Sequence, residues 1–283
     1  MHVTVIDAHV HLWDLAARPQ PWTAEFPALQ RSFLLPDLEP VLDSHGVDAA
    51  VAVQASDTTG ETLDLLALAA TSLRLAGVVG WVDLESRDVP VAVAALKTAP
   101  GGGKLVGVRH QLQVEPDPRY LARPGVREGL IVVAGAGLAY DVVVSPGQLP
   151  LVAETAAALP DVRFVLDHAG KPPIASGDLR AWRADLARLG ALPNMAVKLS
   201  GLVTEADWAG WTQADLAPVI DHVLACFGAE RTMAGSDWPV CLLAADYGAV
   251  RSAIAAALSR LDSAGQTAVL GGTAARWYQI AVR

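Results

Sequence analysis

Two histidines separated by one residue, His9 and His11, form the first pattern in the chain that could do chemistry. They close the run Val3–His11, which is mostly apolar and has the character of a β-strand. Side chains two positions apart on a strand project to the same side, so we expect the two imidazoles to share one space. They could bind one metal ion, or hydrogen-bond one substrate oxygen. The alternative is a strand with one wet face, which the apolar character of the run argues against.

Polar or aromatic side chains also stand at the ends of seven later apolar runs. These are Gln54, Trp81 with Asp83, Arg109 with His110, Asp141, His168, Lys198 with Ser200, and Asp237. Together with His9 and His11 of the first run, His110 and His168 bring to four of seven the histidines at such ends, while His2, His45 and His222 lie elsewhere. Because catalytic groups of a closed β/α barrel lie at the C-terminal ends of its strands, this enrichment predicts one shared site.

The predicted chemistry rests on His9, His11, His168 and Asp237. The three imidazoles could bind one ion such as Zn²⁺, with Asp237 as fourth ligand or as base for an attacking water. Without a metal, the histidines could polarise a carbonyl while Asp237 takes the proton of the water. The structural alternatives are a buried His168 bonded only to backbone, and an Asp237 that caps a helix.

Seven further side chains are predicted to contact a substrate: Arg109, Trp13, Trp22, Gln54, Trp81, Lys198 and Trp238. Arg109 could hold a carboxylate or hydroxyl groups, or pair with a nearby aspartate. A structural salt bridge is an equal alternative for Lys198. The four tryptophans would form an apolar wall suited to a sugar ring, although core packing explains any one of them equally well.

Eight apolar runs alternate with helical patterns and must position these side chains. Strands are predicted over residues 3–11, 48–54, 77–82, 106–111, 138–144, 162–168, 194–200 and 231–237. Helices are predicted over 38–45, 61–75, 89–99, 126–133, 149–159, 178–189, 214–227, 247–261 and 266–278. Eight such units predict an α/β fold, a (β/α)8 TIM barrel. An open doubly wound sheet usually begins with a Gly-rich turn, whereas the first strand here ends in His-Val-His.

Domain organisation is predicted to be simple. Residues 12–36 carry several prolines and aromatic side chains, and we expect them to form an ordered, lid-like loop over the strand ends. No linker or shift in composition marks a second domain, so residues 1–283 are predicted to form a single domain.

Composition limits the class of protein. Hydrophobic residues make up 52% of the 283 and charged residues 18%, which is enough for a large core. A net charge of −9 without a basic cluster argues against nucleic acid as a partner. No apolar run approaches the roughly 20 residues of a membrane span. Met1 to Thr4 show no leader pattern, and Cys226 and Cys241 lack metal-type spacing, so we expect a cytoplasmic protein with reduced thiols.

Six segments carry a resemblance to a known family. They are 6–14 (IDAHVHLWD), 21–22 (PW), 107–110 (GVRH), 164–172 (FVLDHAGKP), 198–202 (KLSGL) and 235–239 (GSDWP). In this order, over nearly the whole chain, they resemble the amidohydrolase-2 family of the amidohydrolase superfamily. Within it, the similarity is to sugar-lactone hydrolases of the L-fuconolactonase and L-rhamnonolactonase type. A His-X-His pair alone is a weak motif, but its combination with a strand-six histidine and a strand-eight Ser-Asp is specific.

The resemblance implies a barrel of the metal-dependent-hydrolase type that opens a small lactone, most simply a sugar-acid lactone, in carbohydrate metabolism. Asp237 would be the general base, and His9, His11 and His168 would bind one divalent ion such as Zn²⁺ or, without metal, the substrate. Arg109 and His110 would bind the substrate, and one of them would protonate or orient the leaving alkoxide.

Two departures from the family pattern matter. Many relatives have a bridging carboxylate or carbamylated lysine at strand four and a histidine at strand five, where this chain has Arg109-His110 and Tyr140-Asp141. A two-metal centre is therefore not expected. Gln20 stands where related lactonases often have tyrosine, so their lid contacts do not carry over. The alternatives are a metal-dependent decarboxylase or another hydrolase of the family acting on a small carboxylate, and a binding barrel without catalysis.

Overall fold

The computed structural model describes residues 4–281 and contains a parallel eight-stranded sheet. Its strands lie side by side in chain order, β1 next to β2 and so on to β8. They span Ile6–Val10 (β1), Ala49–Val53 (β2), Leu75–Gly80 (β3), Leu105–His110 (β4), Ala139–Val142 (β5), Phe164–Leu166 (β6), Met195–Leu199 (β7) and Thr232–Ala234 (β8). The predicted (β/α)8 barrel is confirmed. The predicted strand start at Val3 and the leader interpretation of Met1 to Val3 lie outside the described residues.

The barrel is completed between its first and last strands. Val10 and Trp238 form a parallel bridge, and the His11 amide donates to the Trp238 carbonyl at 2.7 Å. The Asp237 amide donates to the His9 carbonyl at 2.9 Å. These bonds join the ends of β1 and β8, so side chains more than two hundred residues apart in the chain meet at one end of the barrel.

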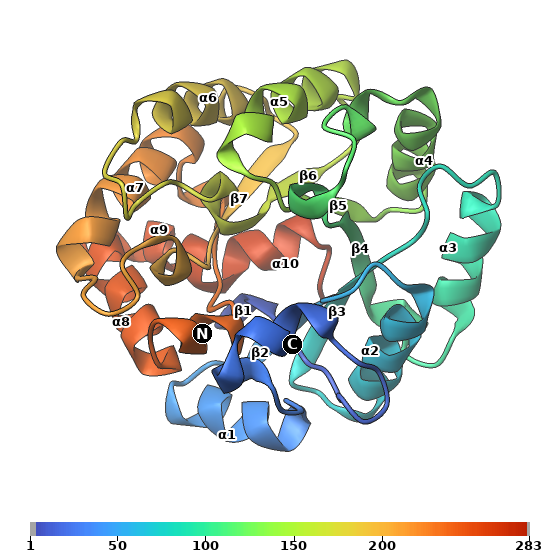
Figure 1. Ribbon diagram of the computed structural model, residues 1–283, viewed down its shortest axis with the longest axis horizontal. Helices are drawn as coiled ribbons and strands as arrows, with labels where there is room; N and C mark the ends of the chain where they lie inside the picture. The colour runs from blue at the N-terminus through green and yellow to red at the C-terminus, as the bar shows by residue number, and fades with distance from the viewer. Residues whose placement is uncertain (1–3, 282–283) are drawn as a thin grey trace.

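Helices surround the strands (Figure 1). They are Leu35–Ser44 (α1), Thr59–Thr71 (α2), Val89–Thr98 (α3), Pro124–Gly135 (α4), Leu149–Ala158 (α5), Arg180–Gly190 (α6), Gln213–Phe227 (α7) and Tyr247–Leu258 (α8). Side-chain caps start several of them: Thr58 accepts from the Glu61 amide before α2, and Asp246 from the Ala249 amide before α8. None of the helices within residues 4–281 combines the length and apolarity needed to cross a membrane.

The last predicted helix, 266–278, is broken. The structure has Ser263–Thr267 (α9), a π-helical turn at Ala268–Gly272 and Thr273–Trp277 (α10). A Cβ on Gly271 would lie 2.1 Å from the Thr4 carbonyl oxygen, so the backbone packs directly against the start of β1. Tyr278, just after α10, is buried among the strand residues of the barrel interior. This C-terminal segment therefore contributes to the interior as well as to the helical layer.

The predicted lid-like loop, residues 12–36, has regular structure of its own. Its ends are joined by two backbone hydrogen bonds between Trp13 and Phe33, of 3.0 and 2.8 Å, and it contains 3₁₀ turns at Pro21–Glu25 and Pro27–Leu29. Helix α1 begins at Leu35 rather than at the predicted residue 38, because the Asp37 carboxylate accepts the Leu34 amide and Pro36 suits a first turn.

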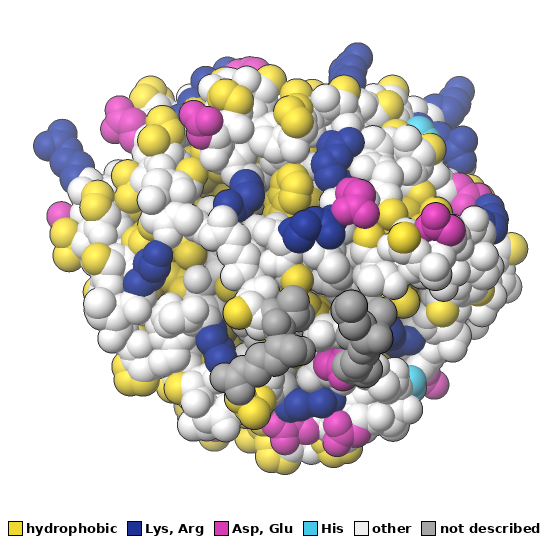
Figure 2. Space-filling model, turned by 180° about the vertical axis from the view of Figure 1, so that it is seen from behind, with side chains coloured by type: hydrophobic (Ala, Val, Ile, Leu, Met, Phe, Trp, Pro, Cys, Tyr) yellow, Lys and Arg dark blue, Asp and Glu magenta, His cyan; other side chains and the backbone are white. Residues whose placement is uncertain are grey.

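Figure 2 shows one face of the molecule, on which positive and negative side chains are interspersed among apolar ones. That distribution agrees with the absence of basic clusters from the sequence.

Candidate active site

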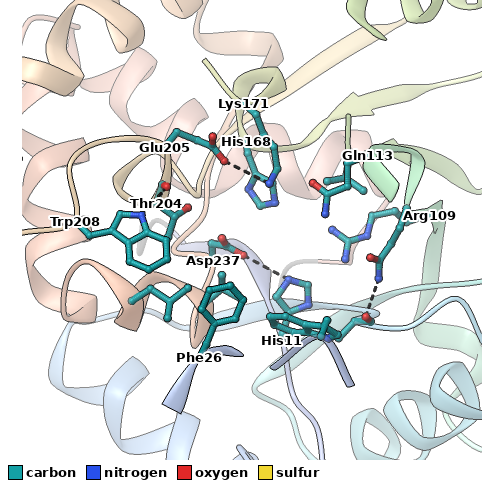
Figure 3. Close-up of a pocket in the computed structure, with 16 residues that line it drawn as sticks. His11, Phe26, Arg109, Gln113, His168, Lys171, Thr204, Glu205, Trp208 and Asp237 are labelled. Carbon is teal, nitrogen blue, oxygen red and sulfur yellow. Dashed lines mark hydrogen bonds and ion pairs between the residues drawn. The ribbon is translucent and has the colours of Figure 1, made fainter. Parts of the chain in front are cut away.

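A cavity of about 380 Å³ opens at the C-terminal ends of the strands, a volume typical of small-molecule sites. Its lining includes five predicted site residues: His11, Trp22, Arg109, His168 and Asp237. In Figure 3, Arg109 and Gln113 lie on one side of the cavity, and Phe26 and Trp208 lie on the other. The cavity therefore has a polar side at Arg109 and Gln113 and, opposite it, a side where two aromatic rings lie near the polar Thr204 and Glu205.

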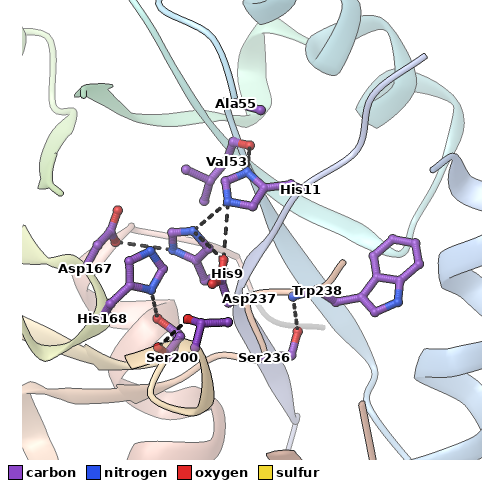
Figure 4. Close-up of polar contacts among 12 residues, drawn as sticks. His9, His11, Val53, Ala55, Asp167, His168, Ser200, Ser236, Asp237 and Trp238 are labelled. Carbon is purple, nitrogen blue, oxygen red and sulfur yellow. Dashed lines mark hydrogen bonds and ion pairs between the residues drawn. The ribbon is translucent and has the colours of Figure 1, made fainter. Parts of the chain in front are cut away.

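The predicted cluster of three histidines and one aspartate is brought together (Figure 4). His9 Nε2 lies 3.1 Å from His11 Nε2. Asp237 Oδ1 lies 3.4 Å from His11 Nε2 and 3.7 Å from His9 Nε2. The rings of His9 and His168 are 4.6 Å apart, and His168 Nδ1 lies 2.9 Å from Ser200 Oγ. The ends of β1, β6, β7 and β8 thus meet in one cluster.

Local backbone geometry directs these side chains. The register of β1 against β2 shifts between Asp7 and Val10, a bulge that adds a residue to β1. The Asp7 carboxylate points outward and accepts a hydrogen bond from the Tyr247 hydroxyl on α8. The His9 and His11 side chains instead point into the cluster. His168 and Asp237 have left-handed backbone, with φ of 53° and 60°. Such φ values are uncommon outside glycine and often mark functional sites.

Burial is the largest influence on the pKa values of the cluster. It lowers the pKa of His168 to about 4 and that of His9 well below its usual range, so both rings are neutral at neutral pH. Burial also acts to raise the pKa of Asp237, but the neighbouring imidazoles, that of His168 most strongly, act in the opposite direction and hold it well below its usual range. Asp237 is therefore an ionised carboxylate at neutral pH.

A second set of buried charges lies next to the cluster: Arg109, Lys198, Asp141 and Asp167. Lys198 Nζ lies 2.5 Å from Asp141 Oδ2 and 2.9 Å from Asp167 Oδ1. Arg109 donates from a guanidinium nitrogen to Asp167 Oδ2 at 3.0 Å. Two cations and two anions compensate one another, as buried charges require. For Lys198 the structure contains the salt bridge, and its side chain is not part of the cavity lining.

The predicted wall of four tryptophans is not formed. Trp13 and Trp238 are buried in the core, each with its ring 5.3 Å from that of Phe33. Trp81 donates from its indole nitrogen to His110 Nδ1 at 3.3 Å, beside the cavity. Of the four, Trp22 alone is part of the cavity lining. The wall prediction failed because indole rings at strand ends can pack sideways into the core as readily as into the cavity.

His110 and Gln54 also lie beside the cavity rather than in its lining. His110 Nε2 lies 3.0 Å from Glu115 Oε2, and its Nδ1 lies 3.2 Å from Asp57 Oδ2. Gln54 donates from its amide nitrogen to Asp57 at 2.7 Å and to the Arg109 carbonyl at 3.2 Å. Both side chains therefore support the segment that carries Arg109.

Sequence reasoning did not single out several lining residues, among them Phe26, Gln111, Gln113, Lys171, Glu205 and Trp208. Lys171 follows the strand-six histidine by three residues, and its Nζ lies 3.3 Å from Glu205 Oε1. Gln111 directly follows strand β4. Lys171 and Gln111 therefore lie close to strand ends, and that position in the chain was a signal that could have identified both. Glu205 and Trp208 lie in a loop after β7 whose path depends on tertiary contacts.

The chemistry of the cluster fits one divalent metal ion. Ligand atoms of His9, His168 and Asp237 lie within 4.8 Å of one another, and all three residues are buried. Asp237 Oδ1 is buried without a hydrogen-bond partner, an environment in which a cation would satisfy its lone pairs. Two imidazoles and a carboxylate form a common Zn²⁺ ligand set, and His11 lies beside them as a further nitrogen ligand.

Fold and site together define a (β/α)8 barrel with a buried three-histidine, one-aspartate centre. The chain belongs to the amidohydrolase family, whose model, described as Amidohydrolase, matches residues 6–280. It is 43% identical to an L-fucono-1,5-lactonase of Burkholderia multivorans over 97% of this chain and 96% of that protein. It is 40% identical to an L-fucono-1,5-lactonase of Burkholderia ambifaria over 97% of this chain and 95% of that protein.

A solved structure extends the likeness to three dimensions. The crystal structure of an amidohydrolase from Burkholderia multivorans with bound zinc superposes with a TM-score of 0.93 at 40% identity. The match covers 98% of this chain and 100% of that one. The expected family membership is thereby confirmed.

Proposed function

We propose that this chain hydrolyses the ring ester of a sugar-acid lactone in carbohydrate metabolism, as the names of its two Burkholderia relatives suggest. The observation that most supports this function is the ionised carboxylate of Asp237, set among three imidazoles at a cavity sized for a sugar ring. Ester hydrolysis needs a base for water and groups that stabilise an oxyanion. The free thiols of Cys226 and Cys241 agree with a cytoplasmic location.

In the proposed reaction, Asp237 takes a proton from the water that attacks the lactone carbonyl. Its Oδ1 is the acceptor, because this atom is buried without a hydrogen-bond partner. When His168 Nδ1 accepts a hydrogen bond from the Ser200 hydroxyl, the proton of the neutral imidazole resides on Nε2. His168 Nε2 then donates a hydrogen bond to the developing oxyanion. A bound divalent ion would lower the pKa of the attacking water and polarise the carbonyl.

The two sides of the cavity provide the proposed substrate contacts. On the polar side, Arg109 and Gln113 would bind hydroxyl groups of the sugar acid. On the other side, Phe26 and Trp208, with ring centroids 6.1 Å apart, would contact the apolar face of the ring. Of the two residues expected to protonate or orient the leaving alkoxide, Arg109 lines the cavity and His110 lies beside it, so we propose Lys171, also in the lining, in place of His110.

The base assignment is tested with Asp237→Asn, which keeps the shape of the side chain. Acid release from L-fucono-1,5-lactone and related sugar-acid lactones is followed with a pH indicator. We expect kcat/KM to fall by roughly 10²–10⁴-fold, because the water loses its base. Asp221→Asn, which removes a surface carboxylate paired with Arg260, should retain activity.

Two results would contradict the proposal. Near-normal turnover by folded Asp237→Asn would refute the base. A wild-type protein that is inactive on the whole lactone panel, or that releases CO2 from a small carboxylate instead, would refute the lactonase function.

A further inference from the structure

Lys198, in the middle of the buried charges, has three potential acceptors around its ammonium group. Its side chain is fully buried, and three acceptors lie around Nζ: Asp141 Oδ2 at 2.5 Å, Asp167 Oδ1 at 2.9 Å and His9 Nδ1 at 3.1 Å. A lysine ammonium has three N–H donors and no acceptor. In the contact with His9 the imidazole nitrogen must therefore accept, and His9 Nδ1 carries no proton.

This contact decides the tautomer of His9 and therefore which nitrogen donates in the hydrogen bond between His9 and His11. A neutral imidazole without a proton on Nδ1 carries it on Nε2. His9 Nε2 faces His11 Nε2 at 3.1 Å, and His11 Nδ1 lies 2.7 Å from the Val53 carbonyl, which can only accept. His11 thus donates from Nδ1 and accepts at Nε2. The donors run from Lys198 through His9 and His11 to Val53, and each finds an acceptor.

We propose that Lys198 is a positioning residue that holds His9 in the tautomer protonated at Nε2, and so weakens the affinity of the site for a divalent cation such as Zn²⁺. In this tautomer His9 Nε2 offers a proton, not a lone pair, to the space between the ligands. His11 Nε2 and the Asp237 carboxylate present lone pairs that can bind a cation, whereas His9 Nε2 does not. The choice of substrate does not enter, so the proposal stands independently of the lactonase function.

The other tautomer has an acceptor waiting. Asp167 Oδ1 lies 3.3 Å from His9 Nδ1 and, despite its ion pair with Lys198, receives no well-directed hydrogen bond. If the proton leaves Nε2 and one binds at Nδ1, Asp167 Oδ1 accepts a hydrogen bond from that Nδ1–H, and Lys198 keeps Asp141 Oδ2 and Asp167 Oδ1 as its acceptors. His9 Nε2 then presents a lone pair to a cation. Lys198, as a hydrogen-bond donor, and Asp167, as an acceptor, thus compete for His9 Nδ1.

The tautomer is measured directly in the metal-free wild-type protein. Ring nitrogens of ¹⁵N-labelled histidines are observed by long-range ¹H–¹⁵N correlation, and the His9 signals are assigned by their loss in His9→Gln. We expect Nε2 of His9 to be protonated and Nδ1 to be bare. A proton on Nδ1 would overturn the proposal, and this measurement needs no variant that perturbs the buried charges.

The link to metal affinity is tested with the double variant Lys198→Met/Asp141→Asn, which removes one positive and one negative charge together. We expect the His9 tautomer to invert, and the Kd for Zn²⁺, measured by competition with a chromophoric chelator, to fall at least 10-fold. Asp141→Asn alone keeps the Lys198 donor and should keep the wild-type tautomer. An unchanged tautomer or an unchanged Kd in the double variant would refute the role of Lys198.

Discussion

Gly201, in the turn after β7, is the position where one added methyl group should reach the catalytic cluster. Its φ of 60° is left-handed, and a Cβ there would lie 2.6 Å from His168 Nδ1 and 3.0 Å from Asp237 Oδ2. Ordinary contacts between such atoms are about 3.5 Å. The substitution Gly201→Ala therefore forces the His168 ring to move by roughly 1 Å, away from its bond with Ser200.

The expected size of the effect follows from that displacement. A misplacement of about 1 Å in a catalytic group can lower the rate about 100-fold. Such a loss corresponds to about 2.7 kcal/mol in the activation free energy. The left-handed backbone adds a cost of about 1–2 kcal/mol to folding, because a Cβ crowds the following carbonyl oxygen. Gly201→Ala should thus remain folded while losing most of its activity.

The assay separates the two effects with a matched control. Gly46, between α1 and β2, has nearly the same φ, 62°, but a Cβ there would have nothing within 4 Å. Gly46→Ala should show a similar loss in urea-unfolding free energy and a kcat/KM within about threefold of wild type. If Gly201→Ala is folded and as active as Gly46→Ala, then His168 and Asp237 are not where the reaction takes place.

Two further predictions concern the cavity wall and the support of the site. Trp208→Ala should raise KM about tenfold with little change in kcat, because an aromatic contact contributes roughly 1.5 kcal/mol to binding; a fall in kcat alone would contradict a binding role. Asp7 accepts from the Ser236 amide and the Tyr247 hydroxyl, both at 2.9 Å, and from the His9 amide at 3.1 Å. Asp7→Ala should therefore lower the unfolding free energy by about 3 kcal/mol, and Tyr247→Phe by about 1 kcal/mol; equal losses in urea unfolding would show that the amide bonds contribute little.

Much of this molecule follows from local pattern. Apolar runs of strand length that alternate with helical periodicity lead to a parallel barrel, because strands buried on both faces must be covered by helices. The barrel in turn brings strand ends together, which is why His9, His11, His168 and Asp237 were predictable as one cluster. Residue type and position along a strand sufficed for these four.

Other features were decided by tertiary contacts. The bulge in β1, which directs Asp7 outward and His9 inward, reflects pairing with β2. Trp13 and Trp238 pack on Phe33, whereas Trp208 and Phe26 reach the cavity from different loops. A rotamer or a loop path depends on the space that neighbouring elements leave, and sequence pattern carries no record of that space.

The same distinction applies to Lys198. Its sequence position left a salt bridge and a substrate contact as equal alternatives, because alternation along a strand places a side chain on a face but does not name its partners. Only the fold brings Asp141, Asp167 and His9 around its nitrogen, within 3.1 Å. The sequence alone determined the barrel and the types of residue at its mouth. The tertiary structure decided which of them point at one another, because hydrogen bonds depend on distances of a few ångströms that close only when distant segments pack.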